Sequence, residues 1–391
     1  MSRKKIAIVS HQYGENICGG AEFHARILAE HLTAYFEVTV LTSESLDSTT
    51  DKHKKGLTLK RFPVKDTLFH RVINRKSKGA LWIKLLLKLG FIILNKKAAY
   101  KVLERSLYTP DLLRFLSKHK NDFDVVIFFS YLFYPTFFGM KLVKEKAILI
   151  PLAHDEPTFY KTPKKLFSTP ALTLFNTQVE KELVQQKISI SENKCSVVGC
   201  GIDETISLDN KTPYPKPYLL YVGRIVKMKG ADLLINHFIQ FVKEHPKYGL
   251  KLLLLGNKKL KIPDHEDVVY MGFTPEKEKF QYLNNALALV NPSYLESLSL
   301  VVLESFFVET PVIVNGECNV LQKHIEKSNA GFAFKNYTDF ERAVLTLLNN
   351  GRSYQKMAQN GKNYYQKKYS WKVVEKKIVA HIHTLINTNE S

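Results

Sequence analysis

Cysteine is scarce in this 391-residue chain, and the spacing of the few cysteines argues against two classes of site. None of them forms a Cys-x-x-Cys pair, and none is spaced from a histidine as zinc ligands are. The simplest interpretation is free thiols in a reducing compartment, with neither a metal site nor a disulfide framework. The four residues are Cys18, Cys195, Cys200 and Cys318.

Long apolar runs are also missing. No stretch approaches the roughly 20 uncharged apolar residues that a transmembrane helix needs, so we expect none. The run from Ile6 to Val9 is too short for the core of a signal peptide and is typical of a first strand. The length favours two domains, because a single core rarely grows past about 250–300 residues.

Acidic residues are scarce between Lys52 and Lys120, where 19 Lys and Arg face three acids. The segment has a net charge of +16, in a chain whose net charge is +20. Such a field favours anionic partners, namely nucleic acid, anionic lipid or a phosphorylated substrate.

Short apolar runs alternate with helix-length amphipathic stretches in two series. This alternation predicts an α/β fold with two parallel, doubly wound, Rossmann-like sheets. We expect ligands in the cleft between them, since open α/β sheets bind at the carboxyl ends of their strands. The strands are expected within residues 4–10, 37–43, 123–130 and 147–154 of the first series, and within 218–223, 250–257, 267–273, 286–293 and 310–316 of the second.

The proline-rich stretch 208–217 predicts a linker between the two domains. The first domain would then cover residues 1–207 and the second residues 218–369. A last helix is expected over 370–391, capped by Ser370, and it either crosses back to the first domain or belongs to the second alone. One apolar face of this helix is formed by Trp371, Val374, Ile378 and Ile382.

Two acids, Glu296 and Glu304, bracket a mostly apolar stretch after a predicted buried strand. If all of it were helical, the second acid would turn by about 80° from the first, which excludes a glycosidase-like pair. Two such acids can instead contact both ends of an extended ligand, with a phosphate on the helix-start amides of Leu298, Ser299 and Leu300. The alternative is a loop acid and a solvated helix residue without a ligand.

Arg224 and Lys229 follow a predicted strand and precede a helix, with Gly223 and Gly230 loosening the turn. Two cations at the carboxyl end of a strand can neutralise a diphosphate, the first as a planar fork and the second as a point charge. The alternative is an exposed basic loop, which is the interpretation we prefer for Lys227.

Two further motifs follow strands of the first series. Gly19 and Gly20 precede a helix that has Glu22 in its first turn, and paired glycines let a backbone approach a ligand closely. A plain turn also explains them. His154 follows the apolar run of residues 147–153, and we expect it to face the cleft. It would act there as a base or as a hydrogen-bonding residue, which is the more common role of a lone histidine at a strand end.

Taken in order, these motifs resemble those of the family 4 retaining glycosyltransferases, which have the GT-B fold. The resemblance extends over nearly the whole chain and is more specific in the second half. It differs from many relatives at Cys200, which replaces an asparagine, and at Ser297 and Ser299, which replace glycines. The matching segments are Gly19–Glu22, His154, Val197–Asp203, Gly223–Gly230, Tyr270–Phe273 and Glu296–Glu304.

The resemblance implies roles for the donor-side residues. Arg224 and Lys229 would hold the donor diphosphate, together with the amides described above. Glu296 would contact the sugar hydroxyls and act in catalysis, and Glu304 would contact the nucleoside ribose. Gly272 would border the nucleobase.

On the acceptor side, the resemblance places Gly19 and Gly20 next to the diphosphate and the acceptor. His154 would lie near the transferred sugar without being an obligatory base. In such a retaining hexosyltransferase the leaving phosphate takes the acceptor proton, and no metal or other cofactor is needed. The expected partners are a UDP- or GDP-sugar and a glycan or lipid-linked acceptor of bacterial polysaccharide or lipopolysaccharide synthesis.

The segment Lys76–Lys101 is predicted to form an apolar helix with lysines along its edges and one tryptophan, Trp82. This combination suits binding to an anionic membrane surface. A core helix is the alternative. We expect a cytoplasmic protein, peripheral on the inner face of the membrane, and no nucleic-acid partner, because no nucleic-acid-binding motif is present. A GT-B-type epimerase or a non-catalytic sugar-nucleotide binder remain as further alternatives.

Overall fold

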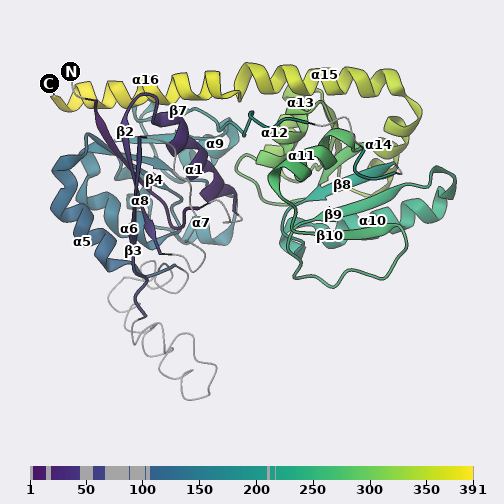
Figure 1. The fold of residues 1–391 in the computed structure, drawn as a ribbon, viewed down its shortest axis with the longest axis horizontal. Coiled ribbons are helices and arrows are strands. Elements are labelled where there is room, and N and C mark those ends of the chain that lie inside the picture. Colours follow the sequence, from purple (N-terminus) through teal and green to yellow (C-terminus); the bar gives the residue numbers. More distant parts are fainter. Residues whose placement is uncertain are drawn as a thin grey trace, which may run out of the picture. The chain divides into compact units, whose positions relative to one another are not determined.

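The computed structural model describes residues 3–14, 19–44, 56–66, 88, 102, 106–208, 212–215 and 217–390 (Figure 1). These residues fall into two compact units. Unit 1 is Met1–Val198 with Glu375–Ser391, and unit 2 is Gly199–Val374. The predicted membrane-docking segment Lys76–Lys101 lies outside the described residues except for Lys88, so that interpretation stays a prediction.

Unit 1 has, within its described residues, a seven-stranded sheet in the order β3-β2-β1-β4-β5-β6-β7. Neighbouring strands pair in parallel, and the central ones are buried because they are almost wholly apolar. The bounds are β1 Lys5–Val9, β2 Glu37–Ser43, β3 Leu57–Phe62, β4 Val125–Phe129, β5 Ala147–Ile150, β6 Leu172–Phe175 and β7 Cys195–Val197.

Helices flank the strands of this unit (Figure 1). Thr177 caps the start of helix α9, because its hydroxyl accepts a hydrogen bond from the Glu180 N–H at 3.1 Å. The bounds are α1 Gly20–Leu32, α5 Pro110–His119, α6 Tyr134–Gly139, α7 Pro157–Lys161, α8 Lys164–Ser168 and α9 Gln178–Lys187.

Unit 2 has a six-stranded parallel sheet among the described residues, in the order β10-β9-β8-β11-β12-β13. Its core is formed by Leu and Val side chains of these strands, packed against helices α10 and α14. The strands are β8 Tyr218–Val222, β9 Lys251–Leu255, β10 Val268–Gly272, β11 Ala288–Asn291, β12 Val312–Asn315 and β13 Gly331–Phe334. The helices are α10 Ala231–Glu244, α11 Glu276–Asn285, α12 Leu300–Phe307, α13 Asn319–Ser328, α14 Tyr337–Asn349, α15 Gly351–Lys368 and α16 Trp371–Glu390.

The order of strands reverses at the first strand of each sheet. Strand β1 lies between β2 and β4, and strand β8 lies between β9 and β11. Ligands of open α/β sheets bind outside the carboxyl ends of the strands at such a reversal. The α/β fold with two doubly wound parallel sheets is confirmed, and each strand that the sequence predicts is present.

The segment that follows β7 belongs to unit 2, although the sequence predicts a first domain that extends to residue 207. Its packing gives the reason. A Cβ on Gly201 would lie 2.6 Å from the Trp371 indole, and the indole Nε1–H donates to the Ile202 carbonyl at 2.7 Å. Glu204 accepts hydrogen bonds from the Tyr365 hydroxyl and from the Trp371 N–H.

Helix α16 begins at Trp371, one residue after its predicted start. Its residues from Glu375 onward cluster with unit 1. The Ser370 hydroxyl donates to the Gln366 carbonyl at 2.9 Å, so it binds the preceding helix α15 and not the first turn of α16. Within the described ranges, none of the helices combines the length and the apolar character that crossing a bilayer requires.

Candidate active site

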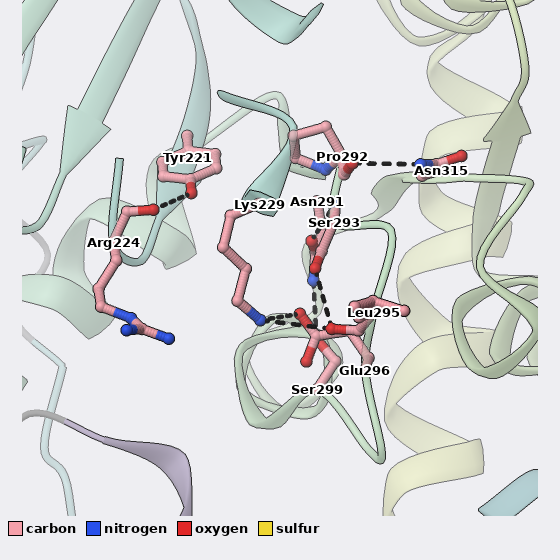
Figure 2. A network of polar contacts seen from close by, with 10 residues as sticks. All are labelled: Tyr221, Arg224, Lys229, Asn291, Pro292, Ser293, Leu295, Glu296, Ser299 and Asn315. Atoms are coloured by element: carbon pink, nitrogen blue, oxygen red, sulfur yellow. Dashed lines mark hydrogen bonds and ion pairs between the residues drawn. The ribbon is translucent and has the colours of Figure 1, made fainter. Parts of the chain in front are cut away.

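Four predicted ligand residues of unit 2 come from the two loops that flank the reversal of its sheet. Arg224 and Lys229 follow β8, and Glu296 and Ser299 follow β11, the neighbour of β8. Figure 2 shows these residues with the polar contacts around them, and the contact drawn for Arg224 is the one from Tyr221 to its backbone. The parallel register therefore brings residues about 70 positions apart to one edge of the sheet, as the sequence predicts.

Lys229 and Glu296 form an ion pair across this edge. The Lys229 Nζ donates to Glu296 Oε1 at 2.7 Å, and it also lies 3.5 Å from the Leu295 carbonyl oxygen. The side chains are 29% and 14% exposed, so the pair is partly desolvated but still reachable from solvent. An incoming phosphate can therefore share Lys229 with Glu296.

Gly230 allows the two loops to approach so closely. Its φ is +66°, a left-handed value that L-residues with a side chain rarely adopt. A Cβ at this position would lie 2.2 Å from the carbonyl oxygen of Pro292. Both the backbone conformation and the contact with the loop after β11 thus require glycine next to Lys229.

Arg224 projects from a backbone that is held on both sides. Its carbonyl accepts a hydrogen bond from the Tyr221 hydroxyl at 2.7 Å, and the following Ile225 bridges in parallel to Lys258 in the loop after β9. The guanidinium is exposed and, among the described residues, has no hydrogen-bond or ion-pair partner (Figure 2). A fixed backbone with an uncommitted planar cation suits an anionic ligand.

The predicted amide cradle lies at the start of α12. The helix begins at Leu300, and Ser299 occupies the N-cap with a φ of +68° and no side-chain cap bond. Leu298, the third predicted residue, precedes this cap and is buried. Within the described part of the chain, the N–H groups of Ser299 and Leu300 donate to no protein acceptor, as expected for the first turn of a helix.

Two buried asparagines that the sequence analysis did not single out shape the loop after β11. The Asn291 Nδ2 donates to Ser299 Oγ at 2.8 Å, and its Oδ1 accepts from the Ser293 N–H at 3.0 Å. Asn315 donates to the Pro292 carbonyl at 3.2 Å. The signal for them was present, since each asparagine is the last residue of a buried parallel strand.

Glu304 is buried inside unit 2. Its carboxylate lies 2.9 Å from the Nζ of Lys279, a buried lysine of α11 that also pairs with Glu276 at 2.7 Å. Burial raises the pKa of Glu304. Burial alone would lower the pKa of Lys279, but the carboxylates of Glu304 and Glu276 outweigh this effect and raise it. The alternative in which Glu304 is a solvated helix residue is therefore wrong, and its contact with a ribose stays a prediction.

Gly272 ends β10 at an irregularity in the register with β9. Its φ is +77°, and a Cβ built on it would meet no atom within 4 Å. The backbone conformation therefore favours glycine at this position, and the space beside it is open. Open space is what a neighbouring planar base would need. Its predicted role at the nucleobase stays a prediction.

The predicted acceptor-side residues lie in unit 1. Gly19 is the N-cap of α1, Gly20 is its first residue, and Glu22 lies in its first turn as predicted. His154 is half-buried in the loop after β5, where its carbonyl accepts from the Glu156 N–H at 2.8 Å. The roles predicted for these residues are not tested by the geometry.

One group of side chains in the described residues has the composition of a cation site. Glu244, His245 and Glu341 place ligand atoms within 4.8 Å of one another. These atoms already bind protein groups, because His245 Nε2 lies 2.7 Å from Glu341, and Glu244 accepts from Gln240 and Tyr337. We assign no metal to this group.

Residues 203–364 match the model of the family described as glycosyl transferases group 1. The matched segment contains Arg224, Lys229, Glu296 and Glu304. Both sheets are also shared with solved structures of the GT-B fold, two of which are described next. The chain has the GT-B fold, and its residues 203–364 are similar to the group 1 glycosyltransferases.

The chain is similar to the capsular polysaccharide biosynthesis glycosyltransferase CapM of Staphylococcus aureus, with 22% identity over 58% of this chain and 64% of CapM. It spans between 54% and 64% of the lengths of three curated relatives. Among solved structures, sucrose-phosphate synthase from Thermosynechococcus elongatus has a TM-score of 0.76 at 16% identity, over 99% of this chain and 100% of that one. HepE of Anabaena, solved with UDP and glucose, has a TM-score of 0.69 at 13% identity, over 97% and 100%.

Proposed function

We propose that the chain is a retaining hexosyltransferase that moves a sugar from a nucleoside diphosphate sugar to a glycan acceptor. The observation that carries the proposal is the cluster at the reversal of the unit 2 sheet. There an uncommitted cation, Arg224, lies on the same edge as the Lys229–Glu296 ion pair. A diphosphate linked to a sugar matches this arrangement of charges.

The cations act on the leaving group. As the bond between the sugar and the diphosphate breaks, negative charge builds on the phosphate oxygens, and Arg224 and Lys229 stabilise it together with the amides at the start of α12. Lys229 engages only Oε1 of Glu296. The second carboxylate oxygen is then able to accept a hydrogen bond from a sugar hydroxyl.

The reaction exchanges one bond at the anomeric carbon for another on the same face of the sugar. The bond from this carbon to the leaving phosphate oxygen breaks, and a bond to the acceptor oxygen forms. The acceptor hydroxyl proton passes to the leaving phosphate oxygen, so that His154 is not needed as an obligatory base. Charge neutralisation by the two cations is the reason we propose a reaction without a metal cofactor.

A UDP-sugar or a GDP-sugar is the proposed donor. UDP is supported by the fold shared with HepE, whose structure holds UDP and glucose. For the acceptor, we propose a lipid-linked intermediate of a surface polysaccharide or lipopolysaccharide in a bacterium, which the similarity to CapM supports. Such an acceptor places the protein in the cytoplasm at the inner face of the membrane.

A sugar-nucleotide epimerase and a non-catalytic binder would use the same donor cluster. They differ from a transferase in their products, because only a transferase releases a nucleoside diphosphate as it lengthens an acceptor. A nucleic-acid-binding protein is disfavoured by the family match over residues 203–364.

The test combines binding and turnover. Thermal unfolding is first measured with a panel of UDP- and GDP-sugars, and the donor is expected to raise the unfolding temperature by mass action. Mass spectrometry then follows that donor with lipid-linked glycan acceptors. An acceptor heavier by one sugar supports the proposal, whereas an isomerised donor or an unchanged mixture with every acceptor contradicts it.

A further inference from the structure

A buried histidine holds the loop that carries the predicted amide cradle. His324, on α13, is 2% exposed, and its Nε2 lies 2.8 Å from the carbonyl oxygen of Leu298. Its Nδ1 lies 3.1 Å from the hydroxyl of Tyr364 on α15. Both ring nitrogens therefore have partners, the carbonyl of Leu298 in the predicted amide cradle and the hydroxyl of Tyr364 outside it.

The chemistry of the partners fixes the protonation of the ring. A carbonyl oxygen only accepts hydrogen bonds, so Nε2 must carry the proton that binds Leu298. Burial lowers the pKa of His324 to about 4, which keeps the ring neutral near pH 7. Nδ1 is then an acceptor, and the Tyr364 hydroxyl donates to it.

The bond to Leu298 also fixes the direction of the next amide. In a planar trans peptide the C=O and the following N–H point to opposite sides. No peptide bond among the described residues is cis. Because the Leu298 carbonyl points to His324, the Ser299 N–H points away from α13, and it has no protein acceptor in the described part of the chain.

This arrangement opposes the backbone preference of Ser299. Its φ of +68° is unfavourable for a residue with a Cβ, by about 1–2 kcal/mol. A turn of the Leu298–Ser299 peptide plane by about 180° would bring that φ into the ordinary negative region. The same turn would remove the carbonyl from His324 and reverse the N–H, so the hydrogen bond from His324 maintains the strained form.

We propose that His324 is a positioning residue that holds the Leu298–Ser299 peptide so that the Ser299 N–H faces the donor diphosphate. The inference rests on the proposed function only for the identity of the ligand. The orientation of the peptide is a property of the chain itself. Asn291 assists by donating to Ser299 Oγ, a contact that fixes the side chain and not the peptide plane.

The first measurement is a crystal structure of H324L, a substitution that removes the donor without adding a buried charge. The expected result is a reversed Leu298–Ser299 peptide with a negative φ at Ser299. H324Q keeps an N–H donor on a side chain of similar reach and should retain the positive φ. An unchanged peptide in H324L overturns the proposal, as does a reversed peptide in H324Q.

The second measurement is UDP and GDP binding by calorimetry. We expect H324L to weaken binding of whichever nucleotide the unaltered protein prefers by about tenfold, equal to one lost hydrogen bond to a charged group. H324Q should restore affinity. Y364F, which removes only the hydroxyl that donates to Nδ1, should weaken binding less, and Y369F should leave it unchanged.

Double variants separate backbone strain from side-chain contacts. Glycine accepts a positive φ without cost, so H324L/S299G should recover the original peptide orientation and most of the affinity. H324L/S299A loses the same contact with Asn291 but keeps the Cβ, and it should not recover. Equal affinities of these two double variants contradict the proposal. If neither the unaltered protein nor any variant binds UDP or GDP, the proposed donor is wrong. The φ of Ser299 in the crystal structures still decides the role of His324.

Discussion

At the scale of single residues, the function of Arg224 is the most direct to test. Its guanidinium has no protein partner in the described residues, so R224A removes a ligand contact without leaving a buried charge unpaired. We expect nucleoside diphosphate affinity to fall by about 10- to 100-fold, the equivalent of about 1.5–3 kcal/mol for a charge-assisted hydrogen bond. Isothermal titration measures this change.

The matched control is K227A, which removes an exposed cation from the same loop. It should bind nearly as well as the unaltered protein. K229A should also weaken binding, but it leaves Glu296 without its partner and is therefore harder to interpret. Equal affinities of R224A and the unaltered protein would rule out this loop as the diphosphate site.

The two glutamates are expected to differ in kinetics and in stability. E296Q should lower kcat most, because Glu296 would contact the reacting sugar, whereas E304Q should mainly raise the donor KM. E304Q leaves the buried Lys279 with Glu276 as its remaining partner, so it should also destabilise the fold by up to about 3 kcal/mol. Kinetics and urea unfolding of both variants test this, and the opposite order would mean that the two ends of the ligand are exchanged.

The buried histidines predict a loss of stability in acid. Burial lowers the pKa of His324 to about 4 from an ordinary value near 6.5, so between these values the unfolded chain binds the proton and the folded chain does not. The free energy of unfolding therefore falls as pH falls through this window, by up to roughly 3 kcal/mol for this residue. His11 and His24 have lowered pKa values for the same reason.

H324Q isolates the contribution of one histidine, because His11 and His24 remain in both proteins. The expected result is a smaller decrease in unfolding free energy for H324Q between pH 6.5 and pH 4, measured by urea titration at each pH. Parallel pH profiles of the two proteins would show that His324 is protonated equally in both states.

At the scale of elements, the turn from β8 to α10 determines whether Lys229 reaches Glu296. G230A combines the cost of a left-handed φ with a Cβ placed 2.2 Å from the Pro292 carbonyl oxygen. G249A has a similar φ of +54°, but its Cβ would meet nothing within 4 Å. We expect G249A to cost about 1 kcal/mol of stability, and G230A to cost more and to weaken nucleotide binding as well.

Urea unfolding and UDP titration of the two alanine variants measure this difference. The comparison is informative because both residues follow short 3₁₀ turns of unit 2. Similar stabilities and similar affinities would mean that the close approach of the two loops is not needed for the site.

Also at this scale, most buried strands were predictable, whereas the edge strands β3, β7 and β13 and the short buried strand β6 were not. Runs such as Val125–Phe129 are wholly apolar and indicate buried parallel strands directly. Strand β3, Leu57–Phe62, has alternating exposed polar residues at the edge of its sheet, and β13, Gly331–Phe334, is short and begins with glycine. Such strands depend on pairing with a neighbour, which a local pattern does not contain.

The site was predictable where a side chain follows a buried strand. Arg224, Lys229 and Glu296 were identified in this way, and the structure brings Lys229 and Glu296 into contact. The partner of Glu304 could not be predicted, because Lys279 lies on a separate helix, α11. Its local sequence does not distinguish it from the many lysines at the surface. The positive φ of Ser299 and its support by His324 arise from tertiary contacts alone.

At the scale of the whole molecule, the charge of +20 has one predicted use beyond donor binding. Positive charge concentrates between Lys52 and Lys120, whereas Arg224 and Lys229 lie in unit 2. A lipid-linked acceptor would draw on such charge together with the apolar residues of the segment Lys76–Lys101. We propose peripheral binding to anionic membranes, strengthened by about 1 kcal/mol for each engaged Lys or Arg.

Replacing Lys84, Lys88, Lys96 and Lys97 with serine should release the protein from anionic vesicles, as measured by co-sedimentation at low salt. The control variant carries serine at four exposed lysines outside that segment and has the same net charge; these are Lys243, Lys356, Lys372 and Lys376. The control should remain bound, because short-range docking depends on where the charges lie, while screened long-range attraction depends on their sum. Equal release of both variants would indicate attraction by net charge alone. If the unaltered protein stays in the supernatant, a water-soluble acceptor is favoured, and the segment Lys76–Lys101 is better interpreted as a core helix.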